Sequence, residues 1–418
     1  MISISRDRKI IKPKKAKPPK EKNPPPQNQK NRSIPPPDAP PPSLKKIRGG
    51  KRFRQIQTVA ILLLIAVMAG TLVFLDSRAP GGLVEWTKDY VATLGGGNGF
   101  PVEVQGGEIK SAKTVGGDVF VLTESVAACY SQNGKKVYSR LHNQQNPSFS
   151  VSRTRLLVYD RGGRKYRIEN REKTLAEADT EFAIFSAAVS ESGSYAVAFD
   201  VHRSACEVVF YDRHNAKLFI YSLAENMTSG LALSKDGKTA AIAAVGVKDG
   251  DYQSLVYIMD IERQVCVKTV EFPGSLIFAV RFNEKGNLTA LADNVISVFT
   301  PSGGDKHDYR FQGELAWKEQ GGENTAAIVR DIGLAQSKAV VISGEGAVLC
   351  EQKVSMETRS VAAGSDSLFC LAGSVLTEYD FHGAVKKTWD CETAPLAVTA
   401  YKNTRALVSY NQSMKIFE

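Results

Sequence analysis

Residues 187–199, AAVSESGSYAVAF, place the polar turn Ser190-Glu191-Ser192-Gly193 between two short apolar runs. The arrangement recurs 44 residues later at Ser234-Lys235-Asp236-Gly237 and a further 49 residues on at Asn283-Glu284-Lys285-Gly286. Ser, Asp and Asn suit the first position of a β-turn, and Gly allows a positive φ near its end. Short apolar runs separated by such turns are typical of an all-β domain.

Longer comparisons within the chain extend this pattern into a repeat. Residues 108–138 align with residues 357–387 at a constant offset of 249, with identical residues at eight positions, including Phe120 with Phe369 and Tyr130 with Tyr379. Each repeat holds about 34–46 residues and four candidate strands, as a propeller blade of four antiparallel strands does. The sequence therefore predicts a β-propeller over residues 100–418.

The blade number follows from counting candidate inner strands. They start near residues 108, 147, 183, 229, 276, 315, 359 and 396, which favours eight blades. Seven remain open, because residues 300–355 are the least regular. The last blade shows three strands before Glu418, and residues 101–104 are expected to supply its fourth strand. Joining both ends of the domain in one blade would remove exposed sheet edges.

A different pattern precedes the propeller. Residues 56–75, IQTVAILLLIAVMAGTLVFL, carry no charge and are long enough to cross about 30 Å of hydrocarbon. The 55 residues before them are too many for the n-region of a cleaved signal peptide. We therefore expect an uncleaved signal-anchor helix over residues 55–76. The basic flank on its N-terminal side predicts a cytoplasmic tail and an extracytoplasmic propeller.

The tail, residues 1–54, contains 17 Lys and Arg against three acids, and 12 of the 18 prolines. Such a composition predicts disorder with local polyproline geometry, serving as a charged spacer or as a proline-rich ligand. No aromatic residue precedes Phe53 to stack on bases, so no nucleic acid is expected. The basic residues nearest the span are predicted to contact anionic lipid headgroups: Lys45, Lys46, Arg48, Lys51, Arg52 and Arg54.

Residues 77–99 connect the span to the propeller. Leu83, Trp86, Tyr90 and Leu94 recur at helical spacing, which predicts a short helix. Trp86 and Tyr90 favour the membrane interface, so this helix is expected either on the outer leaflet or packed as a stalk against the propeller. The glycine-rich segment 95–99 is expected to act as a flexible hinge.

Chemical motifs are sparse. None of the six cysteines forms a CxxC pair, and they are expected to be buried thiols, with disulfides an open alternative. The five histidines are expected to be solvated turn residues, and Asp249-Gly250-Asp251 to be a strand connector. There is no Gly-x-Ser-x-Gly elbow. We therefore predict no catalytic, metal or cofactor site, although acids or triads from separate blades are not excluded by sequence.

The glycines before Phe100, the turn Tyr159-Asp160-Arg161-Gly162-Gly163 and the blade turns resemble bacterial WD40-like and quinoprotein-like propeller repeats. With its Lys/Pro-rich tail and single span, the chain is similar over residues 45–418 to uncharacterised single-pass envelope proteins of Gram-positive bacteria. The Trp-Asp dipeptide of WD40 blades occurs only at Trp389-Asp390, and the Trp-and-Gly motif of quinone-binding propellers is missing. The resemblance thus implies a fold and no cofactor or named partner.

Three functions are compatible with this architecture. The first is a membrane-anchored scaffold whose propeller binds an envelope protein. The second is an extracytoplasmic sensor for cell-wall glycan or a small ligand, which would need exposed aromatics around one face. The third is a hydrolase of wall polymers. The sequence favours the scaffold, because it shows an anchor and a tail and no catalytic motif.

Overall fold

The computed structural model describes residues 51–79, 82–93, 95–318, 322–331, 333–391, 394–402 and 404–418. Internal contacts divide the chain into two units, Met1–Leu64 and Ile65–Glu418, each considered by itself. The predicted disorder of the tail concerns mainly residues 1–50, which lie outside the described residues.

Two helices precede the strands, α1 (Lys51–Arg78) and α2 (Leu83–Thr93). Within α1, the stretch Gln55–Asp76 has 22 residues and a mean hydropathy of 2.7, and its most apolar window is not buried. An apolar helix of this length is long enough to cross a bilayer. By length and composition α1 is thus a candidate membrane anchor, at the position that the sequence predicts.

The strands form eight sheets of four antiparallel strands, which makes the domain an eight-bladed β-propeller. Blades 1 and 2 contain β2 (Ile109–Val115), β3 (Asp118–Thr123), β4 (Val126–Tyr130), β5 (Lys136–Leu141), β6 (Pro147–Val151), β7 (Arg155–Asp160), β8 (Lys165–Asn170) and β9 (Thr174–Asp179). Blades 3 and 4 contain β10 (Ile184–Val189), β11 (Tyr195–Val201), β12 (Ser204–Tyr211), β13 (Lys217–Leu223), β14 (Met227–Leu233), β15 (Thr239–Lys248), β16 (Asp251–Asp260) and β17 (Val265–Pro273).

The remaining blades follow the same order. Blades 5 and 6 contain β18 (Ile277–Phe282), β19 (Leu288–Ala292), β20 (Val295–Phe299), β21 (His307–Arg310), β22 (Glu314–Lys318), β23 (Thr325–Asp331), β24 (Gln336–Ile342) and β25 (Val348–Val354). Blades 7 and 8 contain β26 (Thr358–Ala363), β27 (Ser367–Ala372), β28 (Val375–Asp380), β29 (Val385–Asp390), β30 (Ala397–Tyr401), β31 (Arg405–Ser409), β32 (Ser413–Phe417) and β1 (Val102–Glu103).

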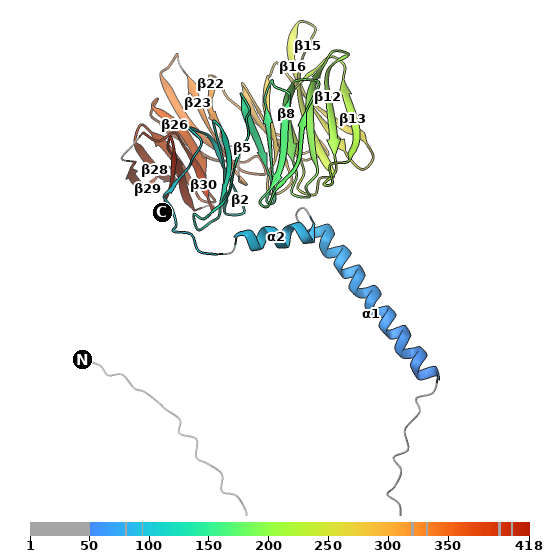
Figure 1. Cartoon of the computed structure of the whole chain (residues 1–418). Helices are drawn as coiled ribbons and strands as arrows, with labels where there is room; N and C mark the ends of the chain where they lie inside the picture. Colours follow the sequence, from blue (N-terminus) through green and yellow to red (C-terminus); the bar gives the residue numbers. More distant parts are fainter. Residues whose placement is uncertain are drawn as a thin grey trace, which may run out of the picture. The chain divides into compact units, whose positions relative to one another are not determined.

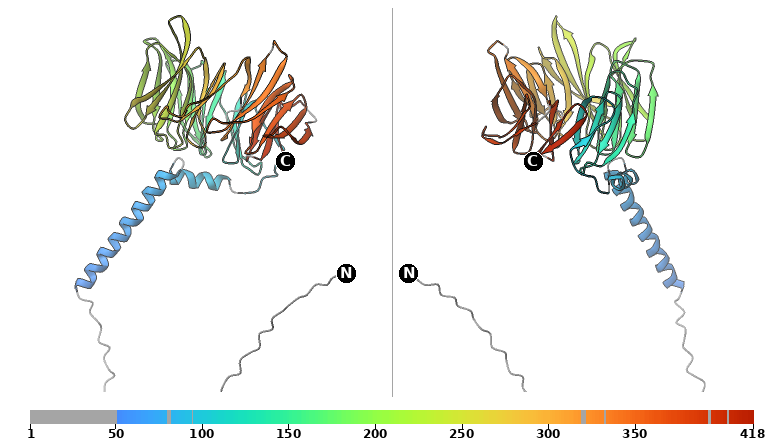
Figure 2. Two further views of the ribbon diagram at one scale, coloured as in Figure 1. Left: turned by 180° about the vertical axis from the view of Figure 1, so that it is seen from behind. Right: turned by 60° about the vertical axis from the view of Figure 1, so that its left-hand side comes forward.

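The ring closes as the sequence predicts. β1 pairs with β32, with Val102 opposite Met414, so the first strand of the domain becomes the outer strand of the last blade. β2 contacts β30, and Figure 2 shows the red last blade beside the cyan first blade. The prediction of eight blades is confirmed, and the alternative of seven is wrong. The observed inner strands begin within two residues of the predicted positions.

One irregularity repeats around the ring. The pairing of the first with the second strand shifts by one residue near the start of six inner strands: β2, β10, β14, β18, β22 and β26. In β2 the shift lies between Ile109 and Ser111, and in β26 between Thr358 and Ser360. These positions differ by the same 249 residues as the internal sequence match. A bulge bends and twists a strand, so its recurrence indicates a common blade geometry.

Alternation along β15 explains how neighbouring blades pack. Ala240, Ile242 and Ala244 face a cluster shared with blade 3, whereas Ala241 and Ala243 face one shared with blade 5. Successive side chains of a strand point to opposite faces of its sheet, and here both faces are buried. The alanines are small enough to let the larger side chains of the adjacent blades fill the space between sheets.

The strand ends define two faces of the propeller (Figure 1). We call one the α2 face; it carries the turns that join the first to the second and the third to the fourth strand of each blade, such as 152–154, 171–173 and 212–216. The distal face carries the turns between second and third strands, such as 161–164 and 249–250. The predicted connector Asp249-Gly250 is confirmed as the tight turn between β15 and β16, with positive φ at both residues.

Candidate membrane-facing site

The helix α2 is fixed at both ends by side chains. The backbone N–H of Leu83 donates to the Asp76 carboxylate at 2.7 Å, which satisfies one of the donors that a helix N-terminus leaves unpaired. At the other end, the Lys135 ammonium donates to the carbonyl of Ala92 at 3.3 Å. A cation at this end also interacts favourably with the helix dipole. Lys135 belongs to blade 1, so this cap ties α2 to the propeller.

The strongest contact between α2 and the blades is the pair Glu85–Arg155. Arg155 begins β7 and its side chain is only 4% exposed. It donates Nε and Nη2 to the two carboxylate oxygens of Glu85 at 3.0 and 2.7 Å, and Nη1 to the carbonyls of Gly193 and Arg213 at 2.8 Å each. A two-pronged arginine–carboxylate pair fixes direction as well as distance. Glu85 therefore sets which side of α2 faces blades 2 and 3.

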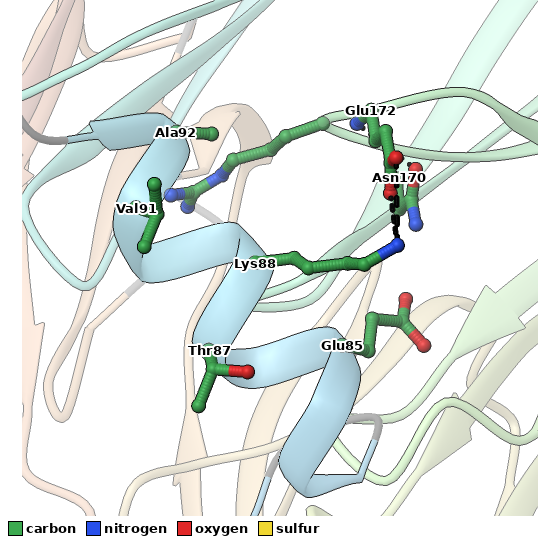
Figure 3. A pocket seen from close by; sticks show the side chains of 8 residues that line it. Glu85, Thr87, Lys88, Val91, Ala92, Asn170 and Glu172 are labelled. Carbon is green, nitrogen blue, oxygen red and sulfur yellow. Dashed lines mark hydrogen bonds and ion pairs between the residues drawn. The ribbon is translucent and has the colours of Figure 1, made fainter.

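Two weaker pairs lie on either side of it. Arg213, in the turn between β12 and β13, contacts the Asp76 carboxylate at 2.7 Å, with both groups partly exposed. The Lys88 ammonium contacts the Glu172 carboxylate at 3.2 Å, and both side chains are exposed to solvent (Figure 3). Exposed ion pairs stabilise a fold by less than about 1 kcal/mol each. These pairs align α2 along the face, whereas the pair Glu85–Arg155 carries most of the attachment.

A cavity of about 390 Å³ remains between α2 and blade 2 (Figure 3). Its wall on the propeller side is the turn between β8 and β9. The lining residues are Glu85, Thr87, Lys88, Val91, Ala92, Asn170, Arg171 and Glu172. Its polar groups are already engaged in part, because Glu172 binds Lys88 and Arg171 binds Asp118 at 2.7 Å. The cavity is therefore a gap beside a docked helix, open to solvent at its rim.

The other side of α2 is apolar and exposed. Trp86 and Tyr90 are 36% and 57% exposed, and their rings stack with centroids 6.0 Å apart. Val84 and Val91 are exposed beside them. At 100° per residue, these four side chains cover the half of the helix opposite Glu85, Lys88 and Ala92. The sequence left open whether α2 packs on the propeller or meets the membrane. The structure shows the packing, with Trp86 partly exposed and Tyr90 largely exposed on the other side.

The glycine-rich segment 95–99, which the sequence predicts to be a flexible hinge, is packed against blade 1. Gly99 N–H donates to the carbonyl of Asn133 at 3.0 Å. A Cβ at Gly97 would overlap that same carbonyl oxygen, and one at Gly134 would overlap the carbonyl oxygen of Gly99. Glycine is needed here because two backbones approach closely. The segment thus leads the chain from α2 into β1 in a defined path.

The structure brings together only part of the predicted site. Trp86 and Tyr90 lie side by side on α2. Lys51, Arg52 and Arg54 fall in the first turn of α1, where only their backbone is described. Lys45, Lys46 and Arg48 lie outside the described residues. Sequence reasoning missed Glu85 and Arg155. The polar residues Glu85 and Lys88 of α2, with the small Ala92 on the same side, were the available signal for a docked side, but nothing in the sequence named Arg155 as the partner.

Other candidate groups are structural. No disulfide joins the six cysteines, all of which are described, and five of them are buried. The prediction of solvated turn histidines is wrong for His142, which is buried and bonded to the carbonyl of Thr123 at 3.1 Å. Burial lowers the pKa of His142. Among the described residues, no group of three or more His, Cys, Asp or Glu is placed to hold a metal ion.

The tryptophans of the blades do not form an exposed platform. Trp317 is half-buried and donates its indole N–H to the carbonyl of Val361 at 3.0 Å. Trp389 packs edge-on against Phe417, with centroids 6.0 Å apart. Binding of a sugar ring by stacking needs a free aromatic face. Neither residue therefore favours the glycan-sensor interpretation over the scaffold.

A closed ring of eight four-stranded blades places the protein among the β-propellers. Residues 102–418 match the model of a family of unknown function, DUF5711, and the chain belongs to this family. No curated protein matches the sequence.

Solved structures show the same fold at low identity. The propeller is similar to the C-terminal WD40 domain of Sif2, with a TM-score of 0.52 and 10% identity over 76% of this chain and 98% of that one. It is also similar to BamB from Moraxella catarrhalis, with a TM-score of 0.50 and 12% identity over 76% of this chain and 97% of that one. Apo AztD from Citrobacter koseri has a TM-score of 0.50 and 11% identity, over 73% of this chain and 90% of that one. Likeness at this identity concerns the fold alone.

Proposed function

We propose that the protein is a membrane-anchored, non-enzymatic scaffold at the cell envelope. In this proposal α1 spans the cell membrane, residues 1–54 are cytoplasmic, and the extracytoplasmic propeller binds a protein partner. The basic residues from Lys45 to Arg54 contact the inner leaflet, and Trp86 and Tyr90 contact the outer one. The similarity to WD40 and BamB propellers is compatible with protein binding, because such rings present wide faces built from turns.

The observation that carries the anchoring is the two-sided character of α2. Its polar side is bonded to the blades through Glu85, and its aromatic side is uncovered within a few residues of an apolar helix. Trp and Tyr are enriched where hydrocarbon meets water, because their rings are apolar with one polar group. An uncovered Trp–Tyr pair next to α1 is therefore best explained by contact with a bilayer.

A separate observation supports partner binding at the distal face. The hairpin of β15 and β16 extends past its neighbouring strands, since β14 begins opposite Val245 and β17 ends opposite Gln253. Val247 and Tyr252 pair across this tip and both are largely exposed. Exposed apolar groups on a protruding element favour a contact with another protein. This hairpin is visible at the top of the ring in Figure 1.

Site-specific crosslinking tests the scaffold. A photoreactive amino acid is placed at Tyr252 of the full chain in cells, and in a matched variant at Ser302, an exposed turn residue of the α2 face. We expect one defined membrane protein to be captured at position 252 and not at 302. Identical capture patterns at the two positions, or capture of abundant membrane proteins alone, would contradict binding at the hairpin.

Topology is tested independently. Protease added to intact, wall-stripped cells should cleave the propeller side of α1 and leave the tail protected, because basic flanks are retained in the cytoplasm. Permeabilised cells provide the control in which both sides are cleaved. Protection of the propeller in intact cells would reverse the proposed orientation.

A further inference from the structure

The α2 face carries an uneven distribution of charge. Its turns in blades 8, 1 and 2 contribute four exposed basic residues, which we call the basic sector: Lys136, Arg153, Lys173 and Lys402. Among the described residues, no carboxylate forms an ion pair with any of them. The acids of the same turns are engaged elsewhere, since Glu172 binds Lys88 and Asp118 binds Arg171. The sector therefore has a net positive charge that the protein itself does not neutralise.

The basic sector lies next to α2. Lys136 follows Lys135, whose ammonium caps the last turn of the helix. Lys173 follows Glu172, the partner of Lys88. Arg153 is two residues before Arg155, which binds Glu85, and its side chain lies beside the glycine turn between β2 and β3. Lys402 lies beside the same turn from the other side. Lys136, Arg153 and Lys173 thus lie within two residues of groups that contact α2, and Lys402 lies beside the glycine turn that Arg153 also contacts.

The opposite part of the same face differs. In blades 4 to 6 the turn lysines pair with acids: Lys235 contacts Glu284 at 2.8 Å, and Lys285 contacts both Glu323 and Glu345, at 3.1 and 2.9 Å. Among the described residues, these turn lysines of blades 4 to 6 are paired and the basic sector beside the aromatic helix is not, which points to a ligand that is anionic and apolar at once. A bilayer surface has both properties, with phosphates above the hydrocarbon boundary.

We propose that the α2 face is an anionic-lipid-binding surface, in which the apolar side of α2 enters the bilayer interface and the basic sector contacts headgroup phosphates. The inference rests on the proposed anchoring by α1 and needs no protein partner. The two contacts act on one rigid body, because the pair Glu85–Arg155 fixes the helix to the blades. The propeller is then held with its α2 face on the membrane and its distal face, with the β15–β16 hairpin, directed away.

The test uses the full chain in lipid nanodiscs that contain equal mole fractions of phosphatidylglycerol and phosphatidylcholine. One of the two lipids is brominated in the upper acyl chain, where bromine quenches tryptophan fluorescence on contact. The signal of Trp86 is the difference between the wild type and W86F. We expect Trp86 to be quenched in both nanodiscs, and roughly twofold more when the brominated lipid is phosphatidylglycerol, because the basic sector enriches anionic lipid around it.

Charge-reversal variants supply the matched control. K136E/R153E/K173E should abolish the preference for brominated phosphatidylglycerol while keeping the quenching of Trp86. R161E/R164E/K248E, which makes the same change of charge on exposed residues of the distal face, should leave the preference intact. An equal loss in both variants would overturn the role of the basic sector and indicate a non-specific charge effect.

The failure of this inference is distinguishable from failure of the proposed anchoring. If the full chain does not copurify with nanodiscs, the anchoring by α1 is wrong. If it copurifies but Trp86 is quenched by aqueous iodide and by neither brominated lipid, the anchor stands and the lipid-binding α2 face is overturned. Circular dichroism of each variant verifies that the propeller remains folded.

Discussion

Blades 1 to 3 and blades 4 and 5 are joined in different ways. Between blades 1 and 2, Arg140 binds the buried Glu169 at 3.2 Å, and Lys113 donates to the carbonyl of Phe149 at 3.2 Å, in addition to apolar contacts. Blades 4 and 5 share a cluster built from aliphatic and aromatic side chains, including Ile258 and Phe299. The pair Lys235–Glu284 between them is exposed.

The two kinds of contact differ in what they specify. An apolar contact supplies stability without direction, whereas a hydrogen-bonded charge pair is satisfied in few orientations. Buried charges cost desolvation free energy and are weak evidence of stability. Arg155 illustrates this in the blade that holds α2, because Glu85 satisfies its buried guanidinium in one orientation of the helix, whereas the apolar cluster of blades 4 and 5 stabilises the ring without fixing a direction.

The largest expected loss of stability comes from the apolar cluster that blades 4 and 5 share. Phe299 is almost fully buried and packs against Phe272 with centroids 6.0 Å apart. Replacing it with Ala leaves a cavity, and F299A should lower the free energy of unfolding by about 3–5 kcal/mol. F299L is the volume-conserving control and should lose less than half of that. Thermal unfolding of the purified full chain measures both, and equal small losses would show that this cluster is loosely packed.

The second effect is local. E85A removes the carboxylate that pairs with the buried Arg155 guanidinium, which should weaken the docking of α2 by about 3 kcal/mol. Hydrogen exchange should accelerate in α2 and near Gly193, while the main unfolding transition shifts little, because Arg155 regains water once α2 leaves. K88A, which removes only an exposed pair on the same helix, should cost less than about 0.5 kcal/mol. Similar exchange in the two variants would contradict the assigned roles.

The third tests the path from α2 to blade 1. G97A places a methyl group on the carbonyl oxygen of Asn133 and should displace segment 95–99 at a cost of about 1–3 kcal/mol. G96A is the matched control, because a Cβ there meets nothing within 4 Å. Limited proteolysis between α2 and β1 reports the displacement. If G96A and G97A are cleaved equally, the segment is a hinge after all.

The smallest effect concerns pH at the boundary of blades 1 and 2. Burial lowers the pKa of Lys113 to about 8, against about 10.5 in an unfolded chain. Between these values the unfolded state binds more protons, so stability rises with pH. We expect a gain on the order of 1–2 kcal/mol, because Lys113 keeps some solvent contact. Stability should rise less steeply for K113M than for the wild type between pH 8 and 9.5 in denaturant titrations, and the difference between the two isolates Lys113, because buried thiols such as Cys206, whose pKa burial raises, make stability fall with pH in both. The range ends below the ordinary pKa of tyrosine. Above it, buried tyrosines such as Tyr166, whose pKa burial raises to about 12, would make stability fall with pH.

Much of the fold was predictable because its signals are local. Turns such as Ser190–Gly193 and the alternation along β15 depend on residues close in sequence, and repetition averages out errors in single strands. The closure by residues 102–103 was predictable by counting, since a three-stranded last blade needs a fourth strand. The packing of segment 95–99 was not predictable, because glycine permits both flexibility and close packing, and the close approach of Asn133 is not visible in the sequence. The prediction that His142 is solvated was wrong because its burial depends on strands outside its own turn.

The sequence by itself determined the apolar helix, the repeat and the aromatic stripe of α2, since each depends on spacing and composition along the chain, and it favoured eight blades over seven. Only the tertiary structure decided which side of α2 is docked and which is uncovered. Glu85 and Arg155 are 70 residues apart, and Arg155 is one of 54 lysines and arginines. Their pairing exists because the ring brings the start of β7 and the turns at Gly193 and Arg213 to one place, and no local pattern encodes that meeting.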